Sequence, residues 1–323
     1  MQKSAIGWIG ALLAGGALLA GGALVTAQDR GGGGRGDAGT TIIEQAPTDH
    51  SIAIPKEKLS QYLKDMDAKK LSTLRMIEGV KHNVNIRRIT NAETALVHPT
   101  TIDLWVVLEG SGTLTAGGQL EKGKILNGVS YPLRVGDIAF IPANLPHGVS
   151  GVNGNITWLN VRWDTDWPAG AELGAGNLPG ARAGGPAAAG TAPLAYAGSG
   201  AVYIPKETLD TYLKDMAARK IATVRMIEGG HFNINIRRID APSVELHPIT
   251  IDTWVVLEGG GTANTHYDRT ADGQRVPGTG VSAPAKAGDV FFIPATLTHG
   301  FSTVDNVMTW LNIRWDVNWA KSQ

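Results

Sequence analysis

The sequence contains no cysteine, and this absence removes several classes of protein at once. Disulfide frameworks, thiolate metal sites, cysteine nucleophiles and lipid anchors attached through cysteine all need the missing thiol. Charge of one sign is not in excess either, because 29 basic and 29 acidic residues cancel in a chain of 323. Without a broad electrostatic field to hold a polyanion, we expect no nucleic acid partner.

Several catalytic signatures are also missing. The chain has no Gly-x-Ser-x-Gly elbow, no phosphate-cradling loop ending in Lys-Ser/Thr and no His-Glu-x-x-His helix. Charged residues make up only 18% of the chain and hydrophobic residues 43%. This composition indicates a globular, core-forming protein, and its length corresponds to about two domains.

The amino terminus is typical of an export signal. Lys3 precedes an apolar stretch over residues 5–25, and Val25-Thr26-Ala27 forms a small-residue cleavage pattern. We predict a signal peptide over 1–27, a secreted or periplasmic protein, and no stable membrane association after cleavage. The alternative is an uncleaved anchor, because the stretch approaches the roughly 20 residues that span a bilayer.

An internal duplication dominates the rest of the chain. Residues 54–90 and 204–240 align without a gap, and 24 of 37 positions are identical. We predict two domains, over 49–167 and 201–323. A Gly-rich segment over 28–48 precedes the first, and an Ala/Gly/Pro-rich linker over 168–200 separates the two because it is too poor in large apolar residues to form a core.

Each repeat is predicted to begin with a helix and continue as strands. Four apolar residues recur at the spacing of one helical face between Pro55 and about Lys70: Leu59, Tyr62, Leu63 and Met66. Short segments rich in Val, Ile, Thr and Trp follow and predict an antiparallel sandwich or barrel. In NITWLNVRWD, Trp158, Asn160 and Arg162 alternate with Leu159, Val161 and Trp163, so one face of a hydrophobic strand is polar.

Histidine and carboxylate residues in each repeat have the spacing of a metal site. A turn at Pro99 would place His98 at the end of one strand and Asp103 at the start of the next, facing one cavity. His147 follows a further apolar strand and turn. Two imidazoles and one carboxylate are the ligands of a facial metal site with open positions for water, oxygen or substrate.

These segments resemble the two motifs of the cupin superfamily. The second cupin motif is Gly, five residues, Pro, four residues and His, and it is matched twice, by Gly136, Pro142 and His147 and by Gly288, Pro294 and His299. The resemblance covers both repeats and implies a bicupin: an all-β chain of two tandem jelly-roll barrels, each preceded by a short amphipathic helix.

The first cupin motif, His-x-His followed by Glu, is matched only in part. Asp103 and Asp252 stand where the family has Glu, and the leading His is Leu96 in the first repeat and Glu245 in the second. The resemblance therefore implies unequal ligand sets, which are His98, Asp103 and His147 in the first repeat and Glu245, His247, Asp252 and His299 in the second. One divalent Fe, Mn, Ni or Zn ion would bind per active domain. Glu245 could instead face solvent, or act as a general base.

Polar and aromatic residues around these sites are candidates for substrate binding, because an arginine fork binds a carboxylate at two points. The candidates are Asn85, Arg87, Trp105, Asn160, Arg162, Asn235, Arg237, Trp254, Asn312 and Arg314. The alternative for the arginines is structural pairing with Glu78, Glu109, Glu228 or Glu258.

Three functions remain open from the sequence. The first is an exported metal-dependent enzyme acting on a small oxygen-rich compound, such as a carboxylate or sugar derivative, with dioxygenase, decarboxylase, lyase and isomerase activities unresolved. The second is a non-catalytic bicupin that binds a small ligand, and the third is a structural paired barrel without metal. Assembly into a homo-oligomer is left open.

Overall fold

The computed structural model describes residues 40–166, 195, 196, 198 and 200–317. The predicted signal peptide, residues 28–39 of the Gly-rich segment and almost all of the linker over 168–200 lie outside the described residues. Within the described part of the chain, no helix is long and apolar enough to cross a membrane.

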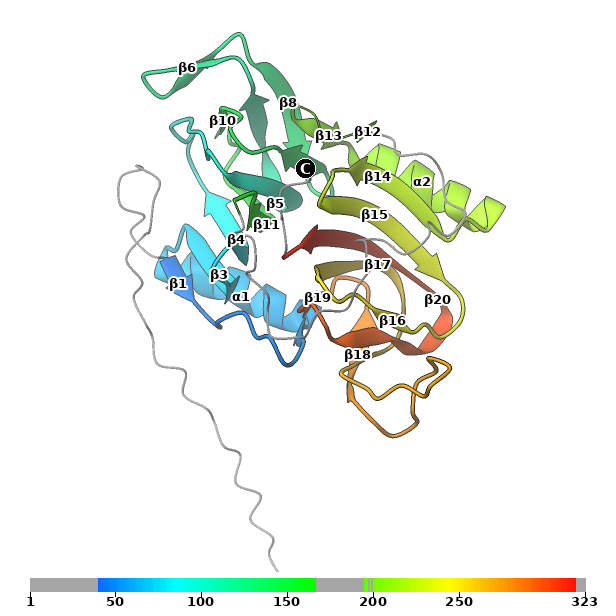
Figure 1. Cartoon of the computed structure of the whole chain (residues 1–323). Coiled ribbons are helices and arrows are strands. Elements are labelled where there is room, and N and C mark those ends of the chain that lie inside the picture. Colours follow the sequence, from blue (N-terminus) through cyan, green and yellow to red (C-terminus); the bar gives the residue numbers. More distant parts are fainter. Residues whose placement is uncertain (1–39, 167–194, 197, 199, 318–323) are drawn as a thin grey trace, which may run out of the picture.

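Two nine-stranded sheets make up most of the structure (Figure 1). The first sheet has the order β1-β3-β4-β11-β5-β9-β13, with β8 and β10 also paired to β5. Its strands are β1 (Thr40–Ile42), β3 (Thr73–Glu78), β4 (His82–Ile89), β5 (Thr101–Ala116), β8 (Val129–Arg134), β9 (Ile138–Ile141), β10 (His147–Ser150), β11 (Ile156–Asp164) and β13 (Val202–Ile204).

The second sheet repeats this arrangement in the order β12-β14-β15-β20-β17-β19-β2, with β16 paired to β20 and β18 to β17. Its strands are β2 (Ile52–Ile54), β12 (Ala195–Tyr196), β14 (Thr223–Glu228), β15 (Phe232–Ile239), β16 (Glu245–Leu246), β17 (Thr250–Thr265), β18 (Val281–Lys286), β19 (Val290–Ile293) and β20 (Thr298–Asp316). A separate two-stranded hairpin consists of β6 (Gln119–Glu121) and β7 (Lys124–Leu126).

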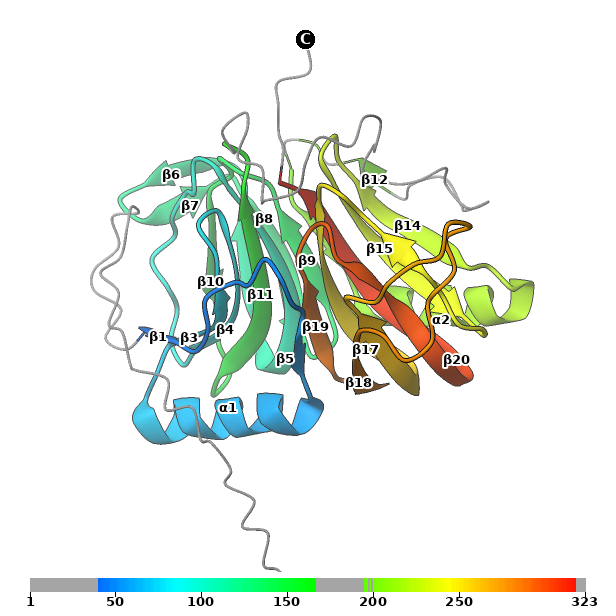
Figure 2. The ribbon, with the colours of Figure 1, turned by 60° about the horizontal axis from the view of Figure 1, so that its bottom comes forward.

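One helix precedes the main strands of each repeat. Helices α1 (Lys56–Lys69) and α2 (Lys206–Arg219) each follow a proline, whose fixed φ suits a helix start. Each ends at a lysine in the left-handed conformation, Lys70 or Lys220. Leu59, Tyr62 and Met66 are buried, as the apolar spacing predicts. Figure 2 shows α1 along one end of the first sheet and α2 at the far side of the second.

The two repeats exchange their first strands. β2, from the first repeat, pairs antiparallel with β19 of the second sheet, and β13, from the second repeat, pairs antiparallel with β9 of the first. The blue segment that leads into α1 can be followed beside β19 in Figure 2. The division of the chain by sequence repeat therefore differs from its division by sheet.

Buried aspartates fasten these exchanged segments. Asp137, in the turn before β9, accepts hydrogen bonds from the Lys206 backbone N–H and the Tyr203 hydroxyl of the other repeat, each at 2.8 Å. Asp289 accepts from the Lys56 backbone N–H in the same way, at 2.8 Å. An acidic group at a helix N-terminus satisfies a free N–H and complements the helix dipole. Each repeat thus caps the helix of the other.

A single hydrophobic cluster joins the two repeats. It contains Leu159, Val161 and Trp163 of β11, together with residues of the second repeat. Trp163 stacks on Trp315 with ring centroids 5.4 Å apart, and His82 stacks on Phe292 at 5.5 Å. The opposite face of β11 carries Trp158, which belongs to a separate cluster inside the first repeat. The alternation predicted for this strand is confirmed.

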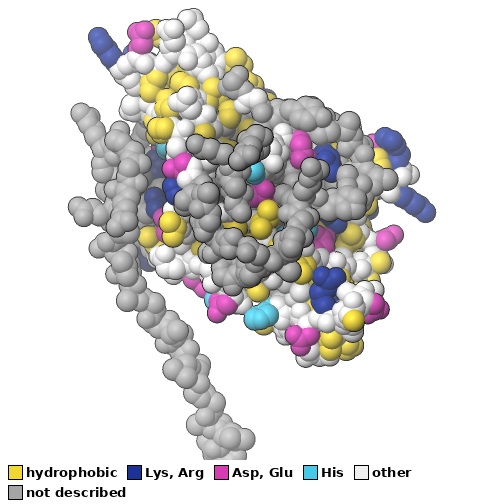
Figure 3. Space-filling model, in the orientation of Figure 1, with side chains coloured by type: hydrophobic (Ala, Val, Ile, Leu, Met, Phe, Trp, Pro, Cys, Tyr) yellow, Lys and Arg dark blue, Asp and Glu magenta, His cyan; other side chains and the backbone are white. Residues whose placement is uncertain are grey.

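The fold agrees with the prediction of an all-β chain with two jelly-roll repeats, each preceded by an amphipathic helix. On the face shown in Figure 3, the basic and acidic side chains that can be seen are interspersed, as the balanced net charge indicates.

Candidate functional site

The first predicted ligand set is brought together by three different segments. The chain bends at Pro99 and Thr100, between His98 and the start of β5. Asp103 is the third residue of β5, and His147 begins β10. Leu96 and His147 exchange two backbone hydrogen bonds of 2.9 Å, which hold the segment before His98 against β10. The predicted turn is present, and it lets His98 and Asp103 face the same side.

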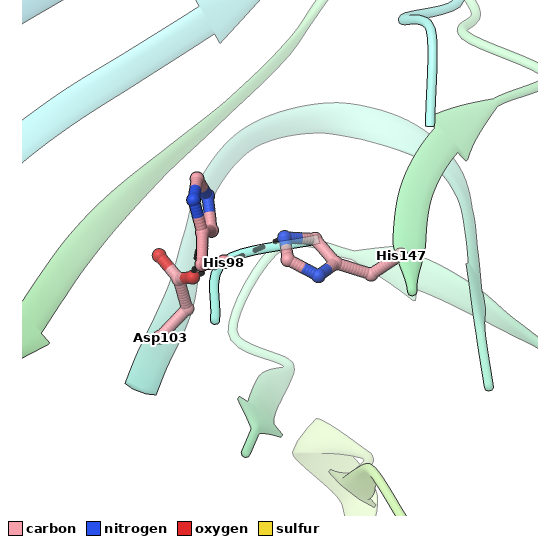
Figure 4. Close-up of side chains that lie close together, drawn as sticks. All are labelled: His98, Asp103 and His147. Atoms are coloured by element: carbon pink, nitrogen blue, oxygen red, sulfur yellow. Dashed lines mark ion pairs between the residues drawn. The ribbon is translucent and has the colours of Figure 1, made fainter. Parts of the chain in front are cut away.

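The three side chains converge on a small volume (Figure 4). Asp103 Oδ2 lies 3.8 Å from His98 Nε2 and 3.9 Å from His147 Nε2. One ligand atom from each of the three residues lies within 4.8 Å of the others. The His147 Nδ1–H donates to the Leu145 carbonyl at 2.9 Å, so its Nε2 faces the site. A hydrogen bond of this kind fixes the tautomer and orientation of a ligating imidazole.

Asp103 is held on one side only. Its Oδ1 accepts a 3.0 Å hydrogen bond from Asn160 Nδ2 and lies 2.9 Å from Arg162 Nε. Its Oδ2 is buried and has no hydrogen-bond partner among the described residues. Because an unpartnered buried carboxylate oxygen is costly, this atom is suited to bind a cation.

The electrostatics keep the ligands ready for a metal. Burial alone would raise the pKa of Asp103, but the charges of Arg162 and the two imidazoles, with the Asn160 hydrogen bond, hold it below the usual 3.8. Burial, with a smaller effect from Arg162, lowers the pKa of His98 to about 4. Metal ligands must be deprotonated carboxylates and neutral imidazoles. At neutral pH, Asp103 is deprotonated and His98 is neutral. The donor set therefore fits a divalent transition metal.

The second ligand set also converges. Glu245 lies in β16, His247 follows that strand, and His299 lies in β20. One ligand atom from each of the three residues lies within 4.8 Å of the others. Asp252 Oδ2 lies 3.4 Å from His299 Nε2 and 3.9 Å from His247 Nε2. The His299 Nδ1–H donates to the Leu297 carbonyl at 2.8 Å, which matches the arrangement of His147.

Two arginines enter the second site. Arg314 Nη2 lies 2.8 Å from Glu245 Oε2 and 2.6 Å from His247 Nε2, and Arg314 Nε bonds to Asp252 Oδ1. Arg237 Nη2 donates to Glu245 Oε1 at 3.0 Å. Glu245 is therefore turned into the site and paired, rather than facing solvent.

These contacts make the carboxylates strongly acidic. Burial alone would raise the pKa of Glu245, but the contact with His247 and the charges of Arg237 and Arg314 hold it well below the usual 4.5. Burial is outweighed in the same way at Asp252, whose pKa falls to about 2 beside Arg314. Both carboxylate oxygens of Glu245 are paired with arginines, and its catalytic role stays a prediction.

The residues predicted to bind substrate share one face of each sheet. In the first repeat, Asn85 is paired in register with Asn160, and Arg87 with Trp158. Arg162 and Asn160 contact Asp103 directly, as described above. In the second repeat, Asn235 and Asn312 are paired in register, and so are Arg237 and Trp310. The predicted polar face is therefore continuous with the candidate metal site in each repeat.

The arginines divide between the two roles foreseen for them. Arg88 and Arg238, which face away from the sites, pair with Glu109 at 3.0 Å and Glu258 at 2.9 Å. Arg87 pairs with Glu93 instead. Glu93 lies in the loop after β4, and no motif or repeat spacing in the sequence distinguished it. Structural pairing therefore accounts for Arg87, Arg88 and Arg238. The other three arginines lie in the sites: Arg162, Arg237 and Arg314.

Both tryptophans predicted on the ligand side lie against a histidine of the site. Trp105 meets His147 edge-on with ring centroids 6.0 Å apart, and Trp254 meets His299 at 5.7 Å. The two indole N–H groups are buried without a hydrogen-bond partner among the described residues. The contact fixes the position of each imidazole ring.

Comparisons with known proteins define the fold. No family model and no curated protein sequence matches the chain. Among solved structures, salicylate 1,2-dioxygenase from Pseudaminobacter salicylatoxidans matches with a TM-score of 0.54 and 14% identity, over 84% of this chain and 85% of that chain. The same enzyme in adducts with gentisate matches with a TM-score of 0.52 and 14% identity, over 84% of this chain and 83% of that chain. A cupin 2 conserved barrel domain protein from Leptotrichia buccalis matches with a TM-score of 0.44 and 10% identity, over 76% of this chain and 88% of that chain.

The chain thus has the bicupin fold, two cupin jelly rolls in one polypeptide. The prediction of two tandem jelly rolls is confirmed at the level of the fold. An identity of 14% to the salicylate dioxygenase describes a shared fold and leaves the reaction to be argued from the site.

Proposed function

We propose that the chain is a metal-dependent enzyme whose active site is the His98, Asp103 and His147 cluster. The observation that carries the proposal is Asp103 Oδ2, which is buried without a partner and directed at two imidazole nitrogens. Asp252 Oδ2 is placed in the same way, but there Arg314 lies against His247 Nε2. Two imidazoles and one carboxylate leave coordination positions open, as in a facial triad. When bound, the metal supplies Lewis-acid polarisation of substrate oxygens and, if it is iron, reaction with dioxygen.

The side chains around the site favour a small carboxylate as substrate. Arg162 holds Asp103 through Nε only, and no bond to its terminal N–H groups is found among the described residues. Its side chain is 20% exposed, so the guanidinium can bind a substrate carboxylate at two points. His98, 24% exposed, lies at the open side of the site, whereas His147 and Asp103 lie at its buried side.

The reaction of an enzyme with a similar fold guides which reaction to propose for this chain. The matched enzyme is described as a salicylate 1,2-dioxygenase and has been seen with gentisate. Both compounds are small hydroxylated carboxylates, which a guanidinium beside a metal can hold by carboxylate and oxygen at once. We therefore favour oxygenation of an aromatic or other oxygen-rich carboxylate, with iron as the first metal to test.

Oxygen consumption by the Fe(II)-loaded protein tests this function. Salicylate, gentisate and non-aromatic hydroxy acids would be supplied in turn, with product analysis. We expect turnover of at least one compound that is abolished in His147→Ala and strongly reduced, mainly through a higher KM, in Arg162→Met. Saturable binding without turnover would contradict an enzyme, and turnover that survives His147→Ala would contradict this site.

Export is part of the proposal. Its support is the apolar stretch over 5–25 followed by Val25-Thr26-Ala27. The expected result is a mature protein beginning at Gln28 in the extracytoplasmic fraction, measured by intact mass and amino-terminal sequencing. Recovery of a membrane-bound chain that retains Met1 would favour the uncleaved anchor.

A further inference from the structure

The candidate site of the second repeat already contains a cation. Arg314, only 5% exposed, inserts its guanidinium among the groups that would ligate a metal. Nη2 lies 2.6 Å from His247 Nε2 and 2.8 Å from Glu245 Oε2, and Nε bonds to Asp252. A guanidinium carries hydrogens on every nitrogen and does not deprotonate in proteins. The guanidinium can only donate, and at 2.6 Å it occupies the side of His247 Nε2 that a metal ion would approach, while Glu245 Oε2 lies 3.1 Å from the same nitrogen.

The equivalent arginine of the first repeat behaves differently. Arg162 approaches Asp103 alone, and its side chain is 20% exposed against 6% for Arg314. The ligand sets explain the difference. Leu96 stands in the first repeat where Glu245 stands in the second, since both lie opposite the motif histidine of their repeat. With carboxylates on two sides, Arg314 is drawn across the site, whereas Arg162 has a carboxylate on one side only.

Charge balance leads to the same conclusion. Glu245 and Asp252 are neutralised by Arg237 and Arg314, through contacts of 3.0 Å or less. A divalent ion entering this site would meet a buried guanidinium at close range, and like charges in a poorly solvated site repel strongly. Among the described residues, no such cation lies between the imidazoles of the first site.

We infer that Arg314 takes the place of the metal in the second site, so that the chain binds one divalent ion, in the first repeat only. The substitution of Glu245 for a ligating histidine is what holds the guanidinium there. The second site is then a permanently neutral ion-pair cluster. The inference rests on the proposed function, because it takes metal binding at His98, Asp103 and His147 as given.

Metal content after chelation and reloading with Zn(II) or Co(II) tests the inference. The full-length protein should bind one equivalent, His147→Ala none, and His299→Ala one. Glu245→Leu gives the second site the residue that the first site has at Leu96, and should raise the content to two equivalents. Arg314→Met should do the same, while Arg162→Met, its counterpart in the first repeat, should remain at one.

The possible outcomes separate the two proposals. Two equivalents in the unaltered chain, or an ion lost in His299→Ala and kept in His147→Ala, would overturn the inference and leave a metal enzyme standing. One equivalent in both Glu245→Leu and Arg314→Met would remove the role given to Arg314. No bound metal in the unaltered chain would overturn the proposed function itself. If Arg314→Met is unstable without metal, the double variant His147→Ala with Arg314→Met isolates the second site, and a rise in its Tm on adding Zn(II) reports binding there.

Discussion

Asp103 and Asp252 show how one residue type serves two sites with different partners. Each aspartate lies beside two imidazoles and one arginine, and in each Oδ2 is buried without a hydrogen-bond partner. The difference arises at a neighbouring position, Leu96 or Glu245, which decides how far the arginine enters. The sequence motifs located both aspartates and all four histidines. Strand alternation placed Arg162 and Arg314 around the sites, but the sequence did not show that they contact the aspartates, because that contact depends on the strand register.

Metal removal gives a prediction at this scale. A ligand that binds only the folded state stabilises it by about 2.7 kcal/mol at 100 times its Kd. Zn(II) should therefore raise the Tm of the unaltered chain, and Asp103→Asn should abolish the shift. Differential scanning fluorimetry with and without chelator measures it. Asp252→Asn is the matched control, and it should retain the shift although the variant is less stable; loss of the shift in Asp252→Asn alone would contradict the assignment.

His82 makes one contribution to the pH dependence of stability. This residue stacks between the repeats, and burial lowers its pKa to about 4. In the unfolded chain His82 is protonated below about pH 6.5, whereas in the folded chain it stays neutral down to about pH 4. Stability therefore falls as pH decreases between these values, by up to about 1.4 kcal/mol per pH unit for one proton.

Replacing His82 by phenylalanine isolates this effect. The second repeat has Phe232 at the equivalent position, where it stacks on Phe140 with ring centroids 5.4 Å apart. In His82→Phe, the slope of the unfolding free energy against pH should decrease between pH 4 and 6.5, by the contribution of about one bound proton. Urea unfolding of the metal-free protein at several pH values measures it, and an unchanged slope would show that His82 is not the group responsible.

At the scale of elements, the helices and the main strands were predictable from periodicity. Pro55 and the apolar positions Leu59, Tyr62 and Met66 predicted α1 because the spacing of one helical face is a local signal. The alternation in β11 was predictable for the same reason. The short strands β2 and β13 were not, because three residues carry too little pattern to show which sheet they join.

The cap that each repeat gives to the helix of the other leads to a further prediction. Asp137→Ala removes the acceptor of the Lys206 N–H, the Tyr203 hydroxyl and the Arg134 N–H. Leaving these partly buried donors unsatisfied should cost about 2 kcal/mol of unfolding free energy. Thermal unfolding measures the loss. Asp137→Asn, which keeps an acceptor oxygen, should lose less, and equal losses in the two variants would contradict the capping role.

At the scale of the whole molecule, the two repeats are joined by exchanged strands and a shared core. The exchanged strands β2 and β13 and the stacking of Trp163 on Trp315 tie each repeat to the other. The duplication predicted two domains, and the sequence could not show this exchange, because each repeat carries the same strand and either partner sheet would satisfy its pattern. Fold and ligand clusters were thus accessible from the sequence, while the contacts between repeats were not.

Cooperativity between the repeats can be measured with Trp163→Ala. Trp163 is fully buried at the junction, and its truncation should cost about 3–5 kcal/mol of unfolding free energy. Fluorescence and circular dichroism should still report a single coincident transition, shifted to lower denaturant. Two separate transitions, with one repeat unaffected, would show that the repeats fold independently.

The central claim is that His98, Asp103 and His147 together bind one divalent ion. Anomalous diffraction from crystals of the metal-reconstituted protein, recorded on both sides of the metal's absorption edge, tests it most directly. The account predicts one strong peak about 2.0–2.2 Å from Nε2 of both histidines and from Asp103 Oδ2, with no peak beside Arg314. A fully loaded crystal with no peak among these three residues would contradict it.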